Sequence, residues 1–183
     1  MMDSLLSQHM DNLSGTDRNA RYESYQYLLN TSNERVSWAY AVWDKLLKML
    51  KSNDNHLRTI AVQILSNLAK SDPENRMLED LDQLIAVTKD ERFVTARHSL
   101  QSLWRAGSAT PALQTLILNK LTDRFIGAME EKNGTLIRYD IIEVFKKIYD
   151  QTGDASLKKS ALDLIEIETD MKYRKKYSGL WKK

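Results

Sequence analysis

Four arginines recur along the chain at nearly equal intervals, and a row of guanidinium groups could bind phosphates or carboxylates. They are Arg21, Arg58, Arg97 and Arg138, separated by 37, 39 and 41 residues. A guanidinium group binds such anions through two parallel hydrogen bonds. Each of these arginines, however, lies directly beside an apolar position of a predicted helix. We therefore favour a structural role, in which each arginine bridges neighbouring repeats by pairing with an acid or with free helix carbonyls.

The histidines do not have the spacing of a metal site. Zinc needs three or four convergent ligands, and only His56 and His98 fall in equivalent helices, with His9 far away in sequence. The chain has no cysteine, which excludes disulfides and thiolate chemistry. It also shows no Ser–His–Asp order, glycine-rich phosphate loop or signature pair of acids. We expect no metal, no cofactor and no catalytic residues, so the chain is predicted not to be an enzyme.

Aromatic residues cluster in the first quarter of the chain and could form a stacking platform for bases or a pocket for an apolar ligand. Tyr40 and Trp43 fall on an apolar helical stripe, so we assign both to the core. Tyr22 and Tyr27 lie off that stripe and are open to either role. The cluster comprises Tyr22, Tyr25, Tyr27, Trp38, Tyr40 and Trp43.

The arginines, histidines and aromatic residues described above lie on a succession of predicted amphipathic helices. The clearest covers residues 54–70, where six apolar residues recur at helical spacing and form one stripe: Leu57, Ile60, Ala61, Ile64, Leu65 and Leu68. With only six glycines and two prolines, the chain has little material for long connections. Further helices are predicted at about 3–13, 17–29, 33–51, 71–88, 91–106, 110–131, 136–149 and from 154 onward.

Local sequence signals predict how several of these helices begin and end. Thr31 and Glu34 have the spacing of a capping box at the start of helix 33–51. Pro73 is expected in the first turn of the helix that follows Ser71, and Pro111 plays the same part after Thr110. We expect Gly107 to close a helix in the left-handed conformation. Gly127 interrupts its helix, which would be explained by the close approach of a neighbouring helix.

A period of about 40 residues is typical of stacked two-helix repeats. The segment from Asp54 to Leu68 resembles the HEAT-repeat family, and it is echoed by Asp17 with Ala20-Arg21, by Ala96-Arg97 and by Leu136-Ile137-Arg138. In the last two copies Phe93 and Gly134 replace the aspartate. The resemblance covers about residues 3–170. It implies an all-α fold, a right-handed α-solenoid of about four to five HEAT-like helix pairs, with the second helices lining a concave side.

The C-terminal segment, residues 171–183, differs from the repeat domain at 1–170. The first 170 residues carry 21 basic and 25 acidic side chains, a net charge of −4. The tail adds Tyr173, Tyr177, Leu180 and Trp181 at amphipathic spacing. It could bind nucleic acid, an acidic protein or an anionic membrane surface, or it could be a helix that caps the end of the stack. The segment has no acid and six basic residues: Lys172, Arg174, Lys175, Lys176, Lys182 and Lys183.

Aligning the second helices on their arginines predicts a binding surface. One row directly follows the arginines, and the other lies four residues further along the same helix faces. We interpret the protein as a non-catalytic scaffold that binds a protein or peptide partner there. The two rows are Tyr22, Thr59, His98 and Tyr139, and Gln26, Gln63, Ser102 and Glu143.

Two alternatives to this scaffold function stay open. One is nucleic-acid binding through the basic tail. The other is an alkylbase DNA glycosylase, because some enzymes of that class are built from HEAT-like repeats and this chain is similar to them in architecture. No apolar run approaches the length of a membrane span, and the N-terminus does not have the pattern of a secretory signal. We therefore expect a cytoplasmic protein.

Overall fold

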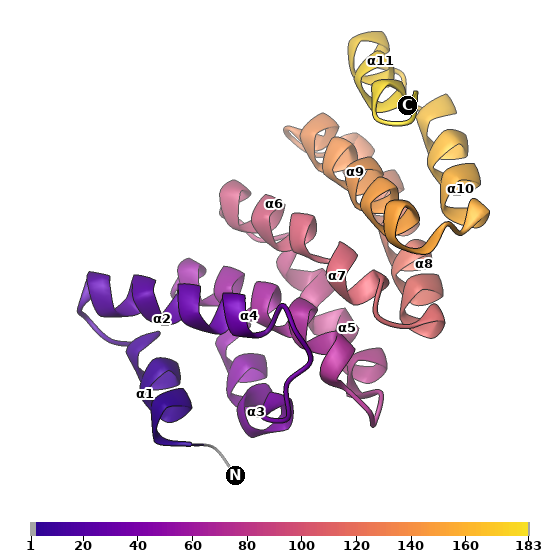
Figure 1. Ribbon diagram of the computed structural model, residues 1–183. Coiled ribbons are helices and arrows are strands. Elements are labelled where there is room, and N and C mark those ends of the chain that lie inside the picture. Colours follow the sequence, from indigo (N-terminus) through magenta and orange to yellow (C-terminus); the bar gives the residue numbers. More distant parts are fainter. Residues whose placement is uncertain (1–2, 183) are drawn as a thin grey trace. The chain divides into compact units, whose positions relative to one another are not determined.

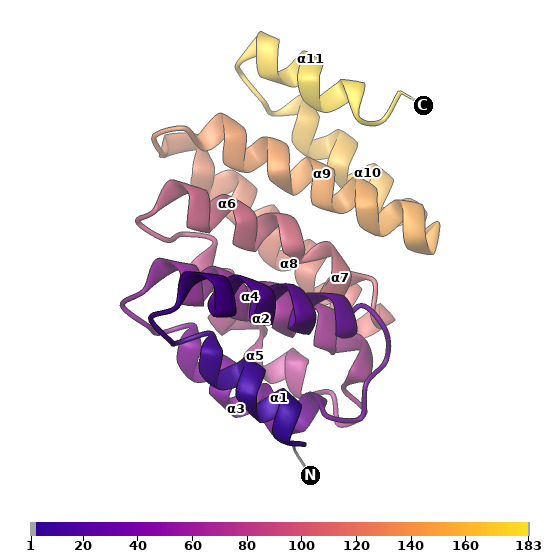
Figure 2. The ribbon, with the colours of Figure 1, turned by 60° about the vertical axis from the view of Figure 1, so that its left-hand side comes forward.

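The computed structural model describes residues 3–182, and every regular element within this range is a helix. The all-α prediction is confirmed for these residues. They form two compact units that meet in sequence between Ser99 and Leu100, and Figures 1 and 2 show the helices of both. No helix in the described range is long and apolar enough to cross a membrane.

The first unit has two layers of helices. α1, α3 and α5 lie on one side, and α2, α4 and the first part of α6 lie on the other (Figures 1 and 2). α1 packs against α2, and α3 packs against α4. The elements are α1 (Ser4–Asn12), α2 (Arg18–Thr31), α3 (Ala39–Met49), α4 (Asn55–Leu68), the 3-10 turn η1 (Ala69–Ser71), α5 (Arg76–Val87) and α6 (Phe93–Ser102).

The second unit is built around α9, which packs against four other α-helices of the unit. α10 covers α9 most extensively, and α11 lies on another part of its surface. The elements that follow α6 are α7 (Trp104–Gly107), α8 (Pro111–Gly127), the 3-10 turn η2 (Ala128–Glu130), α9 (Gly134–Thr152), α10 (Ala155–Glu166) and α11 (Met171–Gly179).

α4 is the central helix of the first unit. It contacts α2, α3 and α5, and all six residues of its predicted apolar stripe are buried. Asp54 caps its N-terminus by accepting a hydrogen bond from the amide of His56 at 2.8 Å. Burial of a leucine or isoleucine side chain contributes roughly 1.5–3 kcal/mol each, so this stripe accounts for the position of α4 in the core.

The predicted start of helix 33–51 is wrong. α2 extends to Thr31, whose hydroxyl donates to the carbonyl of Tyr27 at 2.8 Å instead of capping a new helix. α3 begins only at Ala39. The residues between the two helices are tied to η1, which follows α4, because the amide of Val36 donates to the Ser71 hydroxyl at 3.0 Å.

The α5 start also lies later than predicted. Pro73 precedes the helix, which begins at Arg76 after Asn75 with a left-handed φ of 58°. Asp72 satisfies two amides of the first turn, those of Arg76 at 3.0 Å and Met77 at 2.8 Å. The Tyr40 hydroxyl donates to the same carboxylate at 2.5 Å. By contrast, Thr110 caps α8 and Pro111 is its first residue, as predicted.

Both predictions about Gly107 and Gly127 are wrong. Gly107 belongs to α7 and has no left-handed φ. A larger residue would clash at this position, because a Cβ there would lie 2.5 Å from Cδ1 of Ile148 on α9. Gly127 ends α8, and no neighbouring heavy atom lies within 4 Å of a Cβ built on it. The close helix approach therefore occurs at Gly107.

Three of the four arginines connect to acids in later segments, as the structural interpretation predicts. Arg21 on α2 pairs with Asp54 at 2.5 Å, Arg58 on α4 with Asp90 at 2.5 Å, and Arg138 on α9 with Glu168 at 2.6 Å. Arg138 and Arg58 also donate to backbone carbonyls, those of Ala128 at 2.9 Å and Ser52 at 2.7 Å. Arg97 lies over the ring of Phe93, with 5.9 Å from the guanidinium carbon to the ring centroid.

A glycine at the start of α9 is required by this arrangement. A Cβ on Gly134 would lie 1.9 Å from the carbonyl oxygen of Ala128, the acceptor for Arg138. Gly134→Ala should therefore lower the free energy of unfolding by about 1–3 kcal/mol, the usual cost of overpacking a buried site. Urea denaturation followed by circular dichroism measures this change.

Gly127→Ala is the matched control for that variant. It adds the same methyl group in open space at a helical residue, so it should raise stability by about 0.5–1 kcal/mol. The account of Gly134 would be wrong if the two alanine variants changed the urea midpoint in the same direction.

Candidate functional site

An open cleft of about 710 Å³ lies in the first unit across α2, α4 and the start of α6. Its wall combines aromatic and aliphatic side chains with neutral polar and basic ones, and it contains no carboxylate. The lining residues are Arg18, Arg21, Tyr22 and Tyr25 from α2, Asn55, His56, Thr59, Ile60 and Gln63 from α4, and Val94, Thr95 and His98 from α6.

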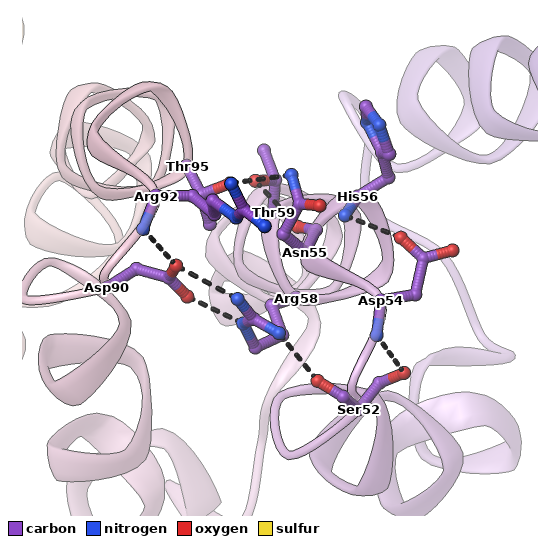
Figure 3. A network of polar contacts seen from close by, with 9 residues as sticks. All are labelled: Ser52, Asp54, Asn55, His56, Arg58, Thr59, Asp90, Arg92 and Thr95. Carbon is purple, nitrogen blue, oxygen red and sulfur yellow. Dashed lines mark hydrogen bonds and ion pairs between the residues drawn. The ribbon is translucent and has the colours of Figure 1, made fainter.

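A polar network fixes α4 relative to the segment that begins α6 (Figure 3). Arg58 makes a bidentate ion pair with Asp90, with Nε–Oδ2 at 2.5 Å and Nη2–Oδ1 at 2.9 Å. Asn55 donates from Nδ2 to the hydroxyl of buried Thr95 at 3.2 Å. Burial by itself raises the pKa of Asp90, but hydrogen bonds from Arg58 and the Arg92 amide outweigh it and hold the pKa below its ordinary value. The carboxylate of Asp90 is therefore ionised at neutral pH.

A second pair of contacts fixes α2 against α4. The Tyr25 hydroxyl donates to Oε1 of Gln63 at 2.7 Å, and Arg21 pairs with Asp54. Burial raises the pKa of Asp54, but the Arg21 guanidinium and the His56 amide outweigh it and lower the pKa. These contacts and those to α6 hold all three helices at fixed positions, so the cleft is formed before any ligand arrives.

Two large hydrophobic side chains are exposed on the wall of this cleft. Tyr22 is 64% exposed and Val94 is 63% exposed, although both lie within well-formed helices. One more large hydrophobic side chain is exposed in the described part of this unit: Leu5 on α1, which is 47% exposed. Exposed apolar side chains gathered in a concave site are typical of binding surfaces.

The structure brings four of the eight predicted contact residues together. Tyr22, Thr59, Gln63 and His98 all line the cleft. Gln26 is half-buried on α2 and lies outside the lining.

The other three predicted contacts belong to the second unit. Ser102 is only 4% exposed, so the prediction that it forms part of an exposed face is wrong. Ser102 is the last residue of α6, so the helical register holds up to this position and it is packing around the side chain that buries it. Tyr139 and Glu143 are half-buried on α9, and the Tyr139 ring lies 6.1 Å from that of Tyr177.

Sequence reasoning missed a third row of cleft residues. Arg18, Asn55 and Val94 each precede a repeat arginine by three residues, and each lies one helical turn before a member of the predicted row. Residues four apart share a helix face, so extending the arginine alignment by one turn toward the N-terminus would have found them.

Two features of the histidines bear on catalysis and metal binding. His9 Nδ1 lies 2.9 Å from the hydroxyl of Ser24, but Ser24 is only 1% exposed and also receives a hydrogen bond from Asn12. A substrate cannot reach this serine. His56 and His98 both line the cleft, while no group of three or more potential metal ligands gathers anywhere within residues 3–182.

The chain matches no known protein-family model, and no curated protein sequence shows a significant match to it. The geometry of the cleft and of the C-terminal helix is therefore the basis for assigning a function.

The C-terminal basic segment has two different faces. Tyr177 is fully buried and donates to the carbonyl of Thr135 at 2.6 Å, and the Trp181 ring lies 5.4 Å from that of Tyr149 on α9. Burial raises the pKa of Tyr177 above its ordinary range. Arg174 pairs with Glu166. The exposed basic residues are Lys172, Lys175, Lys176 and Lys182, and Lys183 lies outside the described residues.

Proposed function

We propose that this protein is a non-catalytic binding scaffold whose first unit binds an extended peptide segment of a partner protein. One observation carries the proposal: the preformed cleft exposes Tyr22 and Val94 on opposite helices, α2 and α6. Tyrosine is among the residue types that most often dominate binding energies at interfaces. Neutral polar side chains of α4 lie between the two anchors, and they can form hydrogen bonds with the N–H and C=O groups of an extended peptide.

The architecture that we propose for the whole chain is a HEAT-like α-solenoid. The arginine-to-acid pairs that join successive elements support it, as do the two helical layers of the first unit. In such a stack, each helix pair contributes one strip of a concave binding surface. A scaffold of this kind needs no cofactor, and the cytoplasm is its expected location.

A displayed library of random peptides tests the proposed function, with the full chain as bait. Enriched peptides should bind in the cleft, so Tyr22→Ala should weaken them about thirty-fold, as expected for a central hot spot worth about 2 kcal/mol. Leu5→Ala is the control, since it removes an exposed hydrophobic side chain of the same unit outside the cleft. Failure of Tyr22→Ala to weaken any enriched peptide would refute the proposal, as would release of alkylated bases from methylated DNA.

Nucleic-acid binding through α11 is the second candidate, supported by three exposed lysines of this helix and by Lys182, which follows it. Truncation before Met171 is a poor test, because it would remove the buried Tyr177 and Trp181 side chains. A Lys172→Gln/Lys175→Gln/Lys176→Gln variant keeps the aromatic contacts and removes charge only. Binding through α11 should fall steeply with salt and disappear in this variant, whereas peptide binding in the cleft should persist.

A further inference from the structure

The cleft is electrostatically one-sided. Its lining contains two arginines and two histidines and no acid. Arg18 is exposed and forms no ion pair with any residue of the described chain. Arg21 uses Nη2 for Asp54, and its Nε and Nη1 groups make no hydrogen bond within the described residues. One end of the cleft on α2 therefore offers guanidinium donors that nothing in the described chain satisfies.

Two amide side chains in the middle of the cleft are held in fixed orientations. Gln63 accepts from Tyr25 at Oε1, which leaves its Nε2 group as a donor. Asn55 donates from Nδ2 to Thr95, which leaves Oδ1 as an acceptor. The two residues are eight positions apart on α4, or about 12 Å along a helix that rises 1.5 Å per residue. A strand-like peptide covers that distance in about three to four residues.

The net charge of the unit argues against a polyanion as the ligand. Residues 1–99 contain 12 Lys and Arg against 14 Asp and Glu, a net charge of −2. A surface that follows a nucleic-acid backbone is basic over a wide area. Within the cleft the free guanidinium donors lie at one end, on α2, and the unit around it is acidic, which suits a single carboxylate flanked by uncharged residues.

On the basis of the proposed function, we infer that the cleft recognises an extended acidic peptide. A carboxylate of the peptide binds at Arg18 and Arg21, and an apolar side chain a few residues away packs against Tyr22 and Val94. The Gln63 donor and the Asn55 acceptor, both on α4, bind the main chain of the peptide. Arg18 determines the preference for an acid, because it is the guanidinium of the pair that has no partner in the described chain.

The peptide library described above tests this inference through the sequences that it enriches. Peptides that depend on Tyr22 should contain an Asp or Glu at a constant distance from an apolar residue. Changing that acid to its amide should weaken binding about tenfold. Arg18→Glu should weaken the acidic peptide by more than tenfold and favour a Lys-substituted version of it. Arg35→Glu is the charge-matched control, because Arg35 is exposed in the same unit but does not line the cleft.

The failures of the two proposals are distinguishable. Peptides that depend on Tyr22 but carry no common acid, or that bind Arg18→Glu as tightly as the unchanged protein, would overturn the acidic-peptide inference and leave the binding function standing. Peptides that ignore Tyr22→Ala would overturn both. Binding of a single-stranded oligodeoxythymidylate that Arg18→Glu abolishes would show that the cleft takes a nucleic acid instead. Circular dichroism of Arg18→Glu and Arg35→Glu establishes that both variants are folded.

Discussion

Replacing Glu168 with glutamine should lower the free energy of unfolding by about 3–5 kcal/mol at neutral pH, because it leaves the buried Arg138 guanidinium without its counter-charge. The Glu168 side chain is completely buried and receives two hydrogen bonds from Arg138, at 2.6 and 3.0 Å. Arg138 also donates to Ala128, so its position in the core is fixed from two sides. Urea denaturation followed by circular dichroism measures the change.

Two further variants distinguish the cost of leaving one charge unpaired from the net contribution of the ion pair to the free energy of unfolding. Arg138→Met/Glu168→Leu removes both charges and should cost less than Glu168→Gln, since no unpaired charge stays buried. Asp163→Asn breaks the exposed pair with Lys159, and it should leave the urea midpoint unchanged. A Glu168→Gln midpoint equal to that of Asp163→Asn would show that the buried pair contributes nothing specific.

The effect of Glu168→Gln should also depend on pH. Burial raises the pKa of Glu168, but hydrogen bonds and the charge of Arg138 outweigh it and hold the folded pKa below 4.5. The ionised carboxylate therefore stabilises the fold above the unfolded pKa of about 4.5, and this contribution is lost as the pH falls through the lower folded value. The stability difference between the unchanged protein and Glu168→Gln should shrink at acidic pH, and a difference that stays constant would contradict the ion-pair account.

Leu65→Ala should lower the free energy of unfolding by about 2–5 kcal/mol, because it removes three buried side-chain carbons from α4 and leaves a void that the surrounding helices fill only in part. Leu65 is fully buried, and α4 contacts helices on three sides. Leu162→Ala makes the same chemical change on α10, where the leucine is 42% exposed. It should shift the thermal midpoint very little, and similar shifts for the two variants would contradict the assignment of α4 as the core helix of the first unit.

Much of the fold could be predicted because helical periodicity and the repeat arginines are local signals. The stripe of α4 and the pairing of Arg21 and Arg58 with acids follow from the types and spacing of neighbouring residues. The start of α3 could not be predicted in this way. Thr31 has the spacing of a capping box, yet the chain continues α2 through it, because the following segment is held by a contact from Val36 to Ser71, 35 residues away.

Part of the candidate site could also be predicted, because the repeat arginines are a local signal that fixes which residues share a helix face. The arginine alignment places Tyr22, Thr59 and His98 on one face, and all three line the cleft. Ser102 fails because packing buries this end of α6, and burial by distant segments is not signalled by the residue types nearby. Val94 was missed because the predicted rows begin one helical turn too late on each helix.

Mapping of a bound peptide onto the protein is the most direct test of the central claim. Full-length protein labelled with nitrogen-15 would be titrated with an enriched acidic peptide, and the amide chemical shifts would be followed by nuclear magnetic resonance. The account predicts that the largest changes fall on Arg18 to Tyr25 in α2, Asn55 to Gln63 in α4 and Val94 to His98 in α6. Changes concentrated in α11, with these three segments unaffected, would contradict it.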